Sequence, residues 1–303
     1  MGGSAVLARG CRAFAWRTRP TGTNVSETIS SRVSAVVVDY HAGDALGACI
    51  DSLHANGVTH VVVVENGEEG SSPPALAQRD VVLVTPRLNL GYGRGVNRGA
   101  AAGARLEYLL VSNPDVEMHE NSVALMVAYL DSHPGVGLVG PQILRPDRTV
   151  YPSQRVFPNF WLAGLHALLS PVWPANPATR RYRSARADGS VDWVSGACFM
   201  VRRDVFERVG GFDERYFMFA EDMALCWQVR EAGMAVGAVQ EATVTHVEGL
   251  SRSRESRAML IAHHRSAMRF EWQTAKGFRR LLAPVATLVL GLRLCVVLMS
   301  GRA

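Results

Sequence analysis

Short apolar runs that alternate with helical stretches dominate the first third of the chain, and this alternation limits the fold more than any other feature. The runs are rich in valine and leucine and cover 33–38, 58–64, 81–84 and 108–111. Between them, 46–56 and 97–105 have helical composition, the first with Asp44 as its expected N-cap and Gly57 as its end. Strand and helix repeated at this interval predict a doubly wound α/β fold around a parallel sheet.

Polar side chains follow these predicted strands, at the point where each strand ends or shortly after it. They are Asp39, Tyr40, Glu65, Asn66, Asn89, Asn113 and Asp115. In open parallel sheets, ligands bind at the carboxyl ends of the strands. We therefore expect these side chains to gather around a ligand.

The composition excludes a disordered chain and a disulfide framework. Hydrophobic residues make up 48% of the 303 residues and charged residues 19%, which suits one large α/β domain or two small ones. The five cysteines are odd in number and form no CxxC pair. Most lie in apolar stretches, which indicates buried, reduced thiols in a cytosolic compartment and no zinc site.

Asp115 has two interpretations at this stage. After Ser112-Asn113-Pro114 it is typical of a turn, or of the cap of a helix that begins near Asn121. A carboxylate at the end of a buried strand can also hold Mg²⁺ or Mn²⁺ against a diphosphate, provided that another part of the chain supplies a further ligand. His246 is a candidate for that ligand, and equally for a histidine of the core.

The stretch NLGYGRGVNRG, 89–99, is rich in glycine but lacks the spacing of the dinucleotide fingerprint. This spacing, together with the clustered carboxylates, disfavours an NAD-binding oxidoreductase. A glycine-rich turn before a helix still lets backbone N–H groups approach a phosphate, and Arg94 is close in sequence to assist.

A second acidic group, Glu221 and Asp222, stands before a segment with an amphipathic pattern. Acidic residues are favourable in the first turn of a helix for electrostatic reasons alone. These two, however, follow the aromatic stretch 216–219, and a carboxylate against an aromatic wall can have a raised pKa and act as a general base. Both interpretations stay open on this pattern.

Taken in order, these motifs resemble a known family. They are Asp39-Tyr40, Glu65-Asn66-Gly67, Asn89-x-Gly91-Tyr92-Gly93 with Asn97 and Gly99, Asn113-Pro114-Asp115, Asp192-Trp193-x-Ser195-Gly196-Ala197, Gly211-Phe212-Asp213-Glu214, Glu221-Asp222 and His246-x-x-Gly249-x-Ser251. Over 33–275 the chain resembles the inverting family-2 glycosyltransferases with the GT-A fold. Within them it is similar to the actinobacterial rhamnosyltransferases that act on decaprenyl-diphospho-N-acetylglucosamine, which VYPSQRVFPN, HALLSPVWPANPATRRYR, VGGFDERYFMFAED and AHHRSA support.

The resemblance implies a GT-A domain over 31–250, in which a Rossmann-like nucleotide-binding sheet is merged with an acceptor-binding half. It implies transfer of L-rhamnose from dTDP-rhamnose, with inversion, to a polyprenyl-diphospho-N-acetylglucosamine acceptor in the synthesis of the linker between arabinogalactan and peptidoglycan. Another nucleotide-sugar donor or glycan acceptor stays open within the family, as does a non-catalytic binding module associated with a membrane.

The resemblance also implies roles for single residues. The nucleotide-sugar contacts are Tyr40, Glu65, Asn66, Asn89, Gly91, Arg94, Asn97 and Asn113. Asp222 matches the catalytic base, with Glu221 beside it, and Trp193 and Gly196 shape the acceptor side.

The metal site implied by the resemblance has Asp115 and His246 at a Mn²⁺ or Mg²⁺ ion on the donor diphosphate. The chain departs from the family pattern in three places. Asn113 stands at the first acidic position of the metal motif, Glu65 stands where Asp is usual, and 39–41 read Asp-Tyr-His. The last two departures concern the selection of the nucleotide base of the donor.

The two ends of the chain differ from its centre. Residues 1–30 are rich in Arg, Ser and Thr without a sustained apolar stretch, so we expect a disordered extension and not a secretory signal. Near the other end, 252–280 holds eight basic residues against two acidic ones, and 281–300 is apolar apart from Arg293.

A basic run before an apolar helix favours contact with an anionic membrane surface over a merely solvated helix face. Because Arg293 is central, a helix in the membrane interface is preferred for 281–300 over a span or a core or oligomer helix. We thus expect 251–303 to form membrane-associating helices, the protein to lie peripherally at the cytoplasmic face of the cell membrane, and no nucleic acid to be bound.

Overall fold

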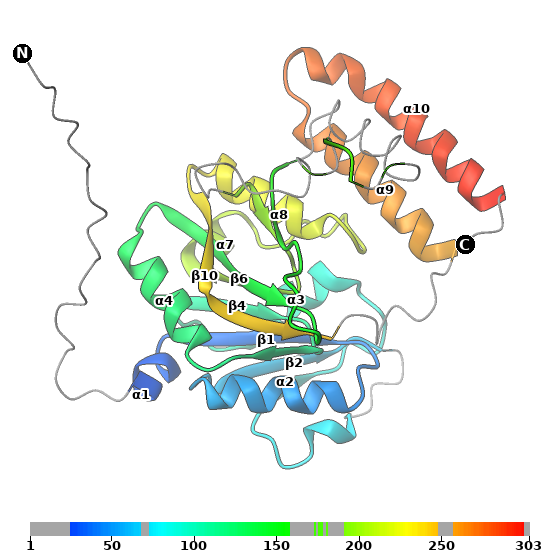
Figure 1. Ribbon diagram of the computed structural model, residues 1–303. Helices are drawn as coiled ribbons and strands as arrows, with labels where there is room; N and C mark the ends of the chain where they lie inside the picture. Colours follow the sequence, from blue (N-terminus) through cyan, green and yellow to red (C-terminus); the bar gives the residue numbers. More distant parts are fainter. Residues whose placement is uncertain are drawn as a thin grey trace, which may run out of the picture.

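One mixed sheet of eight strands organises the computed structural model, which describes residues 25–67, 73–157, 173, 175–177, 180, 191–247 and 257–299 (Figure 1). Across the sheet the strands are β3 (Val82–Val84), β2 (His60–Glu65), β1 (Val33–Asp39), β4 (Tyr108–Ser112), β9 (Cys198–Arg202), β6 (Val136–Leu144), β10 (Ala235–His246) and β5 (Val116–Met118). The first four are parallel, as expected. β9 is antiparallel to β4 and β6, and β5 is antiparallel to β10, so the second half is mixed.

Helices cover both faces of the sheet because successive residues of the strands point to opposite sides. In β1, Val33, Ala35 and Val37 share a core with α2 (Asp44–Ala55) and α4 (Ser122–Ser132). The alternate residues Val36 and Val38 share a second core with α3 (Tyr92–Ala102), α7 (Arg203–Arg208) and α8 (Glu221–Glu231). β1, β2 and β4 are therefore strands that are buried on both faces, whereas the edge strand β3 is partly exposed.

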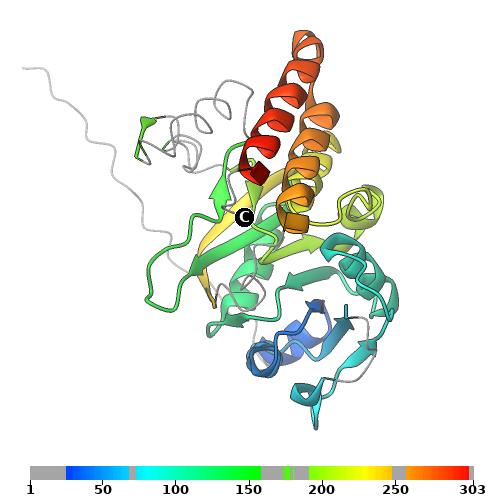
Figure 2. The same cartoon turned by 90° about the vertical axis from the view of Figure 1, so that its right-hand side faces the viewer.

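The remaining described elements lie at the margins of this sheet. They are α1 (Val25–Ser30), the 3₁₀ turn η1 (Pro74–Leu76), the strand pair β7 (Gln154–Arg155) and β8 (Trp193–Val194), α9 (Arg257–Thr274) and α10 (Phe278–Met299). α9 and α10 form a hairpin beside α8 (Figures 1 and 2). No described helix has the length and hydropathy that crossing a membrane requires.

Three local expectations are corrected. Val25–Ser30 is helical with Ile29 buried, so a disordered segment reaching residue 30 is wrong at its end, whereas 1–24 lie outside the described residues. Asp44 is the first residue of α2 and Gly43 precedes it, so Asp44 is not the N-cap. The helix expected at 97–105 begins earlier, directly after Gly91.

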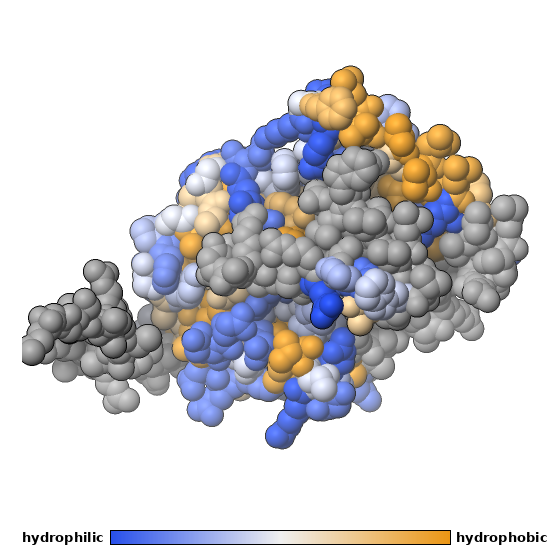
Figure 3. Space-filling model, turned by 45° about the horizontal axis from the view of Figure 1, so that its top comes forward, coloured by the Kyte–Doolittle hydropathy of each residue, from blue (hydrophilic) through white to orange (hydrophobic). Residues whose placement is uncertain are grey.

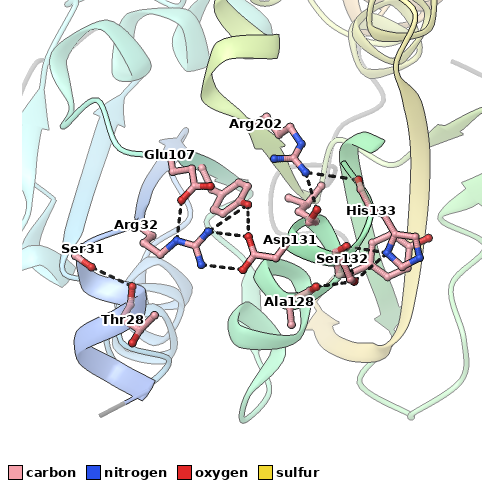
Figure 4. A network of polar contacts seen from close by, with 12 residues as sticks. Thr28, Ser31, Arg32, Glu107, Ala128, Asp131, Ser132, His133 and Arg202 are labelled. Atoms are coloured by element: carbon pink, nitrogen blue, oxygen red, sulfur yellow. Dashed lines mark hydrogen bonds and ion pairs between the residues drawn. The ribbon is translucent and has the colours of Figure 1, made fainter. Parts of the chain in front are cut away.

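A polar network holds the amino-terminal edge of the sheet, opposite the carboxyl ends of β1 and β4 (Figure 4). The Arg32 guanidinium donates to Glu107 at 2.7 Å and to both oxygens of Asp131 at 2.7 and 2.8 Å. The Tyr108 hydroxyl also donates to Asp131, at 2.6 Å. The guanidinium holds the pKa of both carboxyls below the usual range, so the network joins β1, β4 and α4 at neutral pH.

Arg32→Met should lower the free energy of unfolding by about 1–2 kcal/mol, because it leaves two carboxylates without their shared cation. Urea unfolding at neutral pH measures this change. Arg79→Met is the matched control, since Arg79 forms its ion pair with a single carboxylate, Asp51, at the surface, and its effect on the free energy of unfolding should be smaller than that of Arg32→Met. Equal losses in the two variants would show that the network adds nothing beyond a single surface pair.

Candidate active site

The carboxyl ends of β1 and β2 place a buried carboxylate at the expected edge of the sheet. The Asn66 N–H donates to the carbonyl of Asp39 at 2.8 Å, which ties the two strand ends together. The Glu65 Oε1 accepts from the Gly67 N–H at 2.7 Å. Its Oε2 is buried and has no hydrogen-bond partner within the described ranges, and Tyr40 lies exposed just beyond β1. A donor group of a ligand is the partner that such an oxygen lacks.

The glycine-rich turn connects this edge to the segment before Asp222. Asn89 accepts from the Asn66 amide at 3.2 Å and from the Gly91 N–H at 2.9 Å. Gly91 has φ of 80°, and a Cβ there would lie 2.1 Å from the carbonyl oxygen of Phe217. The Tyr92 N–H donates to that same oxygen at 3.1 Å. Only glycine allows this approach of two backbone segments.

Arg94 and Asn97 hold a different segment, 212–214. The Arg94 Nε donates to the Glu214 carbonyl at 2.8 Å. The Asn97 side chain donates to the Phe212 carbonyl and accepts from the Phe212 N–H, each at 2.9 Å. Their observed contacts are therefore within the protein, between α3 and the chain that leads to α8, and contact with a nucleotide remains a prediction for both.

Asp115 and His246 meet although they are far apart in the sequence. Their Oδ1 and Nε2 atoms lie 3.1 Å apart, and both side chains are largely buried. β5 brings them together, because it follows Asp115 directly and pairs antiparallel with β10, with His246 opposite Val116. The Asn113 N–H donates to the Ala197 carbonyl at 2.8 Å, which joins the end of β4 to the second half of the sheet.

The carboxylate of Asp222 is fixed by two backbone N–H groups. The Gly196 N–H donates to Oδ2 and the Met223 N–H to Oδ1, each at 2.8 Å. The Gly196 carbonyl in turn accepts from the Tyr92 hydroxyl at 2.6 Å. Burial raises the pKa of Asp222 above its usual value, while the two N–H groups oppose the rise. The group is thus oriented, and its proton affinity is suited to a general base.

Glu221 lies beside Asp222, and its carboxylate is less completely hydrogen-bonded. Burial, and then the charge of Asp222, raise the pKa of Glu221. Its Oε2 is buried and has no hydrogen-bond partner in the described part of the chain. When two neighbouring carboxyls are buried, ionisation of one disfavours ionisation of the other. One negative charge on the pair is therefore the favoured state.

Trp193 is part of the core and does not form an exposed surface of the site. Its side chain is 6% exposed, and its indole N–H donates to the Val156 carbonyl at 3.2 Å. The Arg155 guanidinium lies over the indole, 5.1 Å from the ring centroid. Gly196, three residues on, is the neighbour that reaches Asp222, so contact of Trp193 with an acceptor remains a prediction.

Two residues of the site are absent from the sequence-based set. Tyr92 links the glycine-rich turn to Gly196, and Arg155 is the nearby cation that lowers the pKa of Asp222 against the effect of burial. The position of Tyr92 between two glycines was a usable signal. Arg155 stands in an irregular segment, where no pattern pointed to Asp222.

Residues 31–268, most of the chain, match the profile of the glycosyltransferase-like family 2. The chain belongs to this family. The glycosyltransferase is 38% identical over 262 residues to the N-acetylglucosaminyl-diphospho-decaprenol L-rhamnosyltransferase of Mycobacterium tuberculosis strain H37Rv, with 81% of this chain and 85% of the relative covered. It is 24% identical over 263 residues to the rhamnosyltransferase WbbL of Escherichia coli strain K12, with 82% and 92% covered.

Solved structures confirm the GT-A fold of the glycosyltransferase. GalNAc-T7 with UDP, GalNAc and Mn²⁺ matches with a TM-score of 0.55 and 14% identity, over 80% of this chain and 52% of that chain, about half its length. The mannosyltransferase PcManGT from Pyrobaculum calidifontis, in complex with GDP-Man and Mn²⁺, matches with a TM-score of 0.55 and 16% identity, over 89% and 76%. At these identities the likeness shows the fold alone.

Glu221→Gln should flatten the pH dependence of the free energy of unfolding. The folded-state pKa of Glu221 is raised, whereas the unfolded chain ionises near the usual value of about 4.3. Between these values the folded protein holds the extra proton, so wild-type stability falls as pH rises, and glutamine removes this contribution.

Urea unfolding at several pH values from about 5 to 8 measures this slope. Glu241→Gln, at an exposed position of β10, should keep the wild-type slope. A wild-type slope in Glu221→Gln would contradict the raised pKa.

Proposed function

We propose that this glycosyltransferase transfers a rhamnosyl group from dTDP-rhamnose, with inversion, to a polyprenyl-diphospho-N-acetylglucosamine acceptor, as a step of cell-wall linker synthesis. The observation that carries the proposal is that residues 196–197 connect Asp222 to Asn113, two residues before Asp115. The Asn113 N–H donates to the Ala197 carbonyl and the Gly196 N–H to the Asp222 carboxylate. The 38% identity to the Mycobacterium tuberculosis rhamnosyltransferase supports the choice of donor and acceptor.

The nucleotide part of the donor fits the ends of β1 and β2. The buried, unpartnered Oε2 of Glu65 accepts a donor group of the base or ribose. Tyr40 is exposed at the adjoining strand end and offers a ring for contact with the base. Asn66, Asn89 and Gly91 shape the turn that follows, through their mutual hydrogen bonds.

Asp115 and His246 fit a divalent ion that is held jointly by the protein and the donor diphosphate. No cluster of three or more His, Cys, Asp or Glu side chains able to hold an ion is found among the described residues. Mg²⁺ is commonly bound through one or two protein side chains together with substrate phosphates, and an adjacent oxygen and nitrogen suit Mn²⁺ as well. When bound, the ion stabilises the charge that develops on the leaving diphosphate.

Asp222 removes the proton from the attacking acceptor hydroxyl. The hydroxyl oxygen bonds to the anomeric carbon while the bond from that carbon to the diphosphate oxygen breaks, and the nucleoside diphosphate leaves with the electron pair. The two backbone N–H groups on Asp222 aim its carboxylate, which favours attack from the side opposite the leaving group and hence inversion. Glu221 stays protonated beside it, because burial opposes a second charge.

The acceptor of this reaction is anchored in a lipid bilayer, so the enzyme works at a membrane surface. We place it peripherally at the cytoplasmic face, in contact with anionic lipid through the α9–α10 hairpin. The exposed apolar side chains of α10 and the exposed basic residues of both helices support this placement. Arg252 and Arg254 of the basic run lie outside the described residues.

Asp222→Asn should lower turnover by about 10²–10⁴-fold while affinity for the nucleotide stays nearly unchanged, because only proton removal is lost. The assay follows rhamnosyl transfer from dTDP-rhamnose to a short-chain, soluble polyprenyl-diphospho-N-acetylglucosamine. Asp204→Asn, an exposed carboxylate on α7, should retain full turnover. Near-normal turnover in Asp222→Asn would remove its assignment as base, and wild-type transfer only from another nucleotide sugar would overturn the choice of rhamnose.

Removal of divalent ions with EDTA should abolish transfer, and Mn²⁺ or Mg²⁺ should restore it. Asp115→Ala should weaken metal-dependent binding of dTDP-rhamnose by about tenfold or more, because one ligand of the ion is lost. Titration calorimetry with and without the ion measures this binding. Glu117→Gln, exposed on β5, serves as the neighbouring control. Full activity in chelator contradicts the proposed ion.

A further inference from the structure

A basic hollow on α9 is not used by the reaction described above. It has a volume of about 520 Å³ and is lined by Arg215, Arg265, Met268, Arg269, Trp272 and Gln273. None of these described lining residues is acidic. Three guanidinium groups around one hollow match the oxygens of a phosphate, which arginine binds through its forked N–H groups.

The charges of these arginines are only partly compensated. Arg215 forms a bidentate pair with Asp213, from Nη2 to Oδ2 at 2.6 Å and from Nε to Oδ1 at 2.8 Å. Arg269 lies over the Tyr216 ring, 5.9 Å from its centroid. Neither Arg265 nor Arg269 forms an ion pair with any of the described residues. The hollow therefore keeps a net positive charge.

Two side chains of the hollow contact α10. The indole N–H of Trp272 donates to the Thr287 hydroxyl at 2.8 Å, and the Met268 side chain lies beside Gly291. The side of α10 that is turned away from α9 carries an apolar row, with side chains 48–73% exposed: Phe278, Leu281, Val285, Leu288, Val289 and Leu292. Their spacing puts them along one face, and Figure 3 shows hydrophobic residues gathered over α10 at its upper right.

The charges of α9 and α10 indicate which kind of partner covers the apolar row. Glu271 is the one acidic residue in the described parts of α9 and α10, and it is paired with Arg279 and only 14% exposed. The apolar row is flanked by the exposed cations Arg280 and Arg293. A second copy of the chain would bring these like charges together, whereas an anionic bilayer complements both the cations and the apolar row.

We propose that the hollow on α9 binds the phosphate of an anionic membrane phospholipid, in a bilayer that the apolar row of α10 enters. This deepens, and rests on, the proposed transfer to a lipid-linked acceptor. α9 also holds the segment before Asp222, because the Ser266 hydroxyl donates to the Met218 carbonyl at 2.8 Å and the Tyr216 hydroxyl to Gln273, which borders the hollow, at 2.7 Å. A lipid in the hollow therefore sets the height of the active site above the membrane.

Sedimentation of the full-length protein with vesicles of phosphatidylglycerol and phosphatidylcholine tests the hollow. Arg265→Gln/Arg269→Gln should bind these vesicles at least about tenfold more weakly than Arg280→Gln/Arg293→Gln, which removes the same charge from the same hairpin. Equal losses would overturn the proposal, because diffuse attraction would then account for the binding. On vesicles of phosphatidylcholine alone, we expect no difference between the two double variants, and a difference as large as on the anionic vesicles would also overturn it.

A double substitution to lysine separates the effect of guanidinium geometry on vesicle binding from the effect of charge. Arg265→Lys/Arg269→Lys keeps both charges but loses the forked geometry, so anionic vesicle binding should still fall about threefold to tenfold. Arg280→Lys/Arg293→Lys should bind like the wild type. Wild-type binding by the first lysine variant would overturn a built phosphate site.

Transfer to the soluble short-chain acceptor separates this proposal from the proposed function. For Arg265→Gln/Arg269→Gln, kcat and KM with that acceptor should stay at wild-type values, which also shows that the variant is folded. A raised KM with unchanged vesicle binding would overturn the proposal and assign the hollow to the diphosphate of the acceptor. If the wild type transfers no sugar, the proposed function fails while the vesicle comparison still decides the lipid site.

Discussion

The approach of Gly91 to the carbonyl of Phe217 is the constraint on which the active site depends. The two backbones are so close that no side chain fits between them, and the Tyr92 N–H bonds to the same carbonyl. From there the Tyr92 hydroxyl reaches Gly196, whose N–H holds Asp222. One chain of contacts thus runs from the glycine-rich turn to the Asp222 carboxylate, so the separation of these two parts of the candidate site is set by close backbone packing and by the Tyr92 side chain.

The segment between Phe217 and Asp222 carries backbone strain. Phe219 and Ala220 have φ of 67° and 60°, in the left-handed region that side chains other than glycine rarely adopt. Such conformations persist when surrounding contacts fix them. Here the contacts come from Tyr92 on one side and from Ser266 of α9 on the other. These contacts hold the strained segment, and with it Glu221 and Asp222 at the start of α8, against the glycine-rich turn.

The half of the site that depends on local pattern could be predicted from the sequence. The four parallel strands and the polar residues at their ends follow from the valine-rich runs and from the turn-forming residues that bound them. The start of α3 could not be predicted, because glycine disfavours helices. In the fold Gly93, within the missed first turn, lies so close to Phe212 that a Cβ would be 2.9 Å from that side chain, so packing outweighs propensity. Ile29 is the same case, since its burial gives α1 a reason to fold.

Long-range contacts could not be derived from local pattern, and the meeting of Asp115 with His246 was expected only from the family resemblance. His246 meets Asp115 only because β5 pairs with β10 in one register, and a shift by one residue would turn His246 to the other face of the sheet. Arg94 and Asn97 stood at suitable positions for a phosphate, yet they bond to 212–214, since that segment folds back over α3. Side-chain type and spacing constrained which residues carry chemistry, whereas the pairing of distant strands decided which of them meet.

α9 belongs to the catalytic unit even though its composition resembles that of a membrane-binding appendage. Phe270 is buried with Tyr216 and Ala224 of the active-site segment and α8, and the family profile extends to residue 268, within this helix. The same helix also carries the exposed Arg265 and Arg269, the second of which lies over the Tyr216 ring. α9 thus contacts the segment before Asp222 and at the same time presents basic residues at the surface. A surface that binds α9 therefore lies against the helix that holds this segment in place.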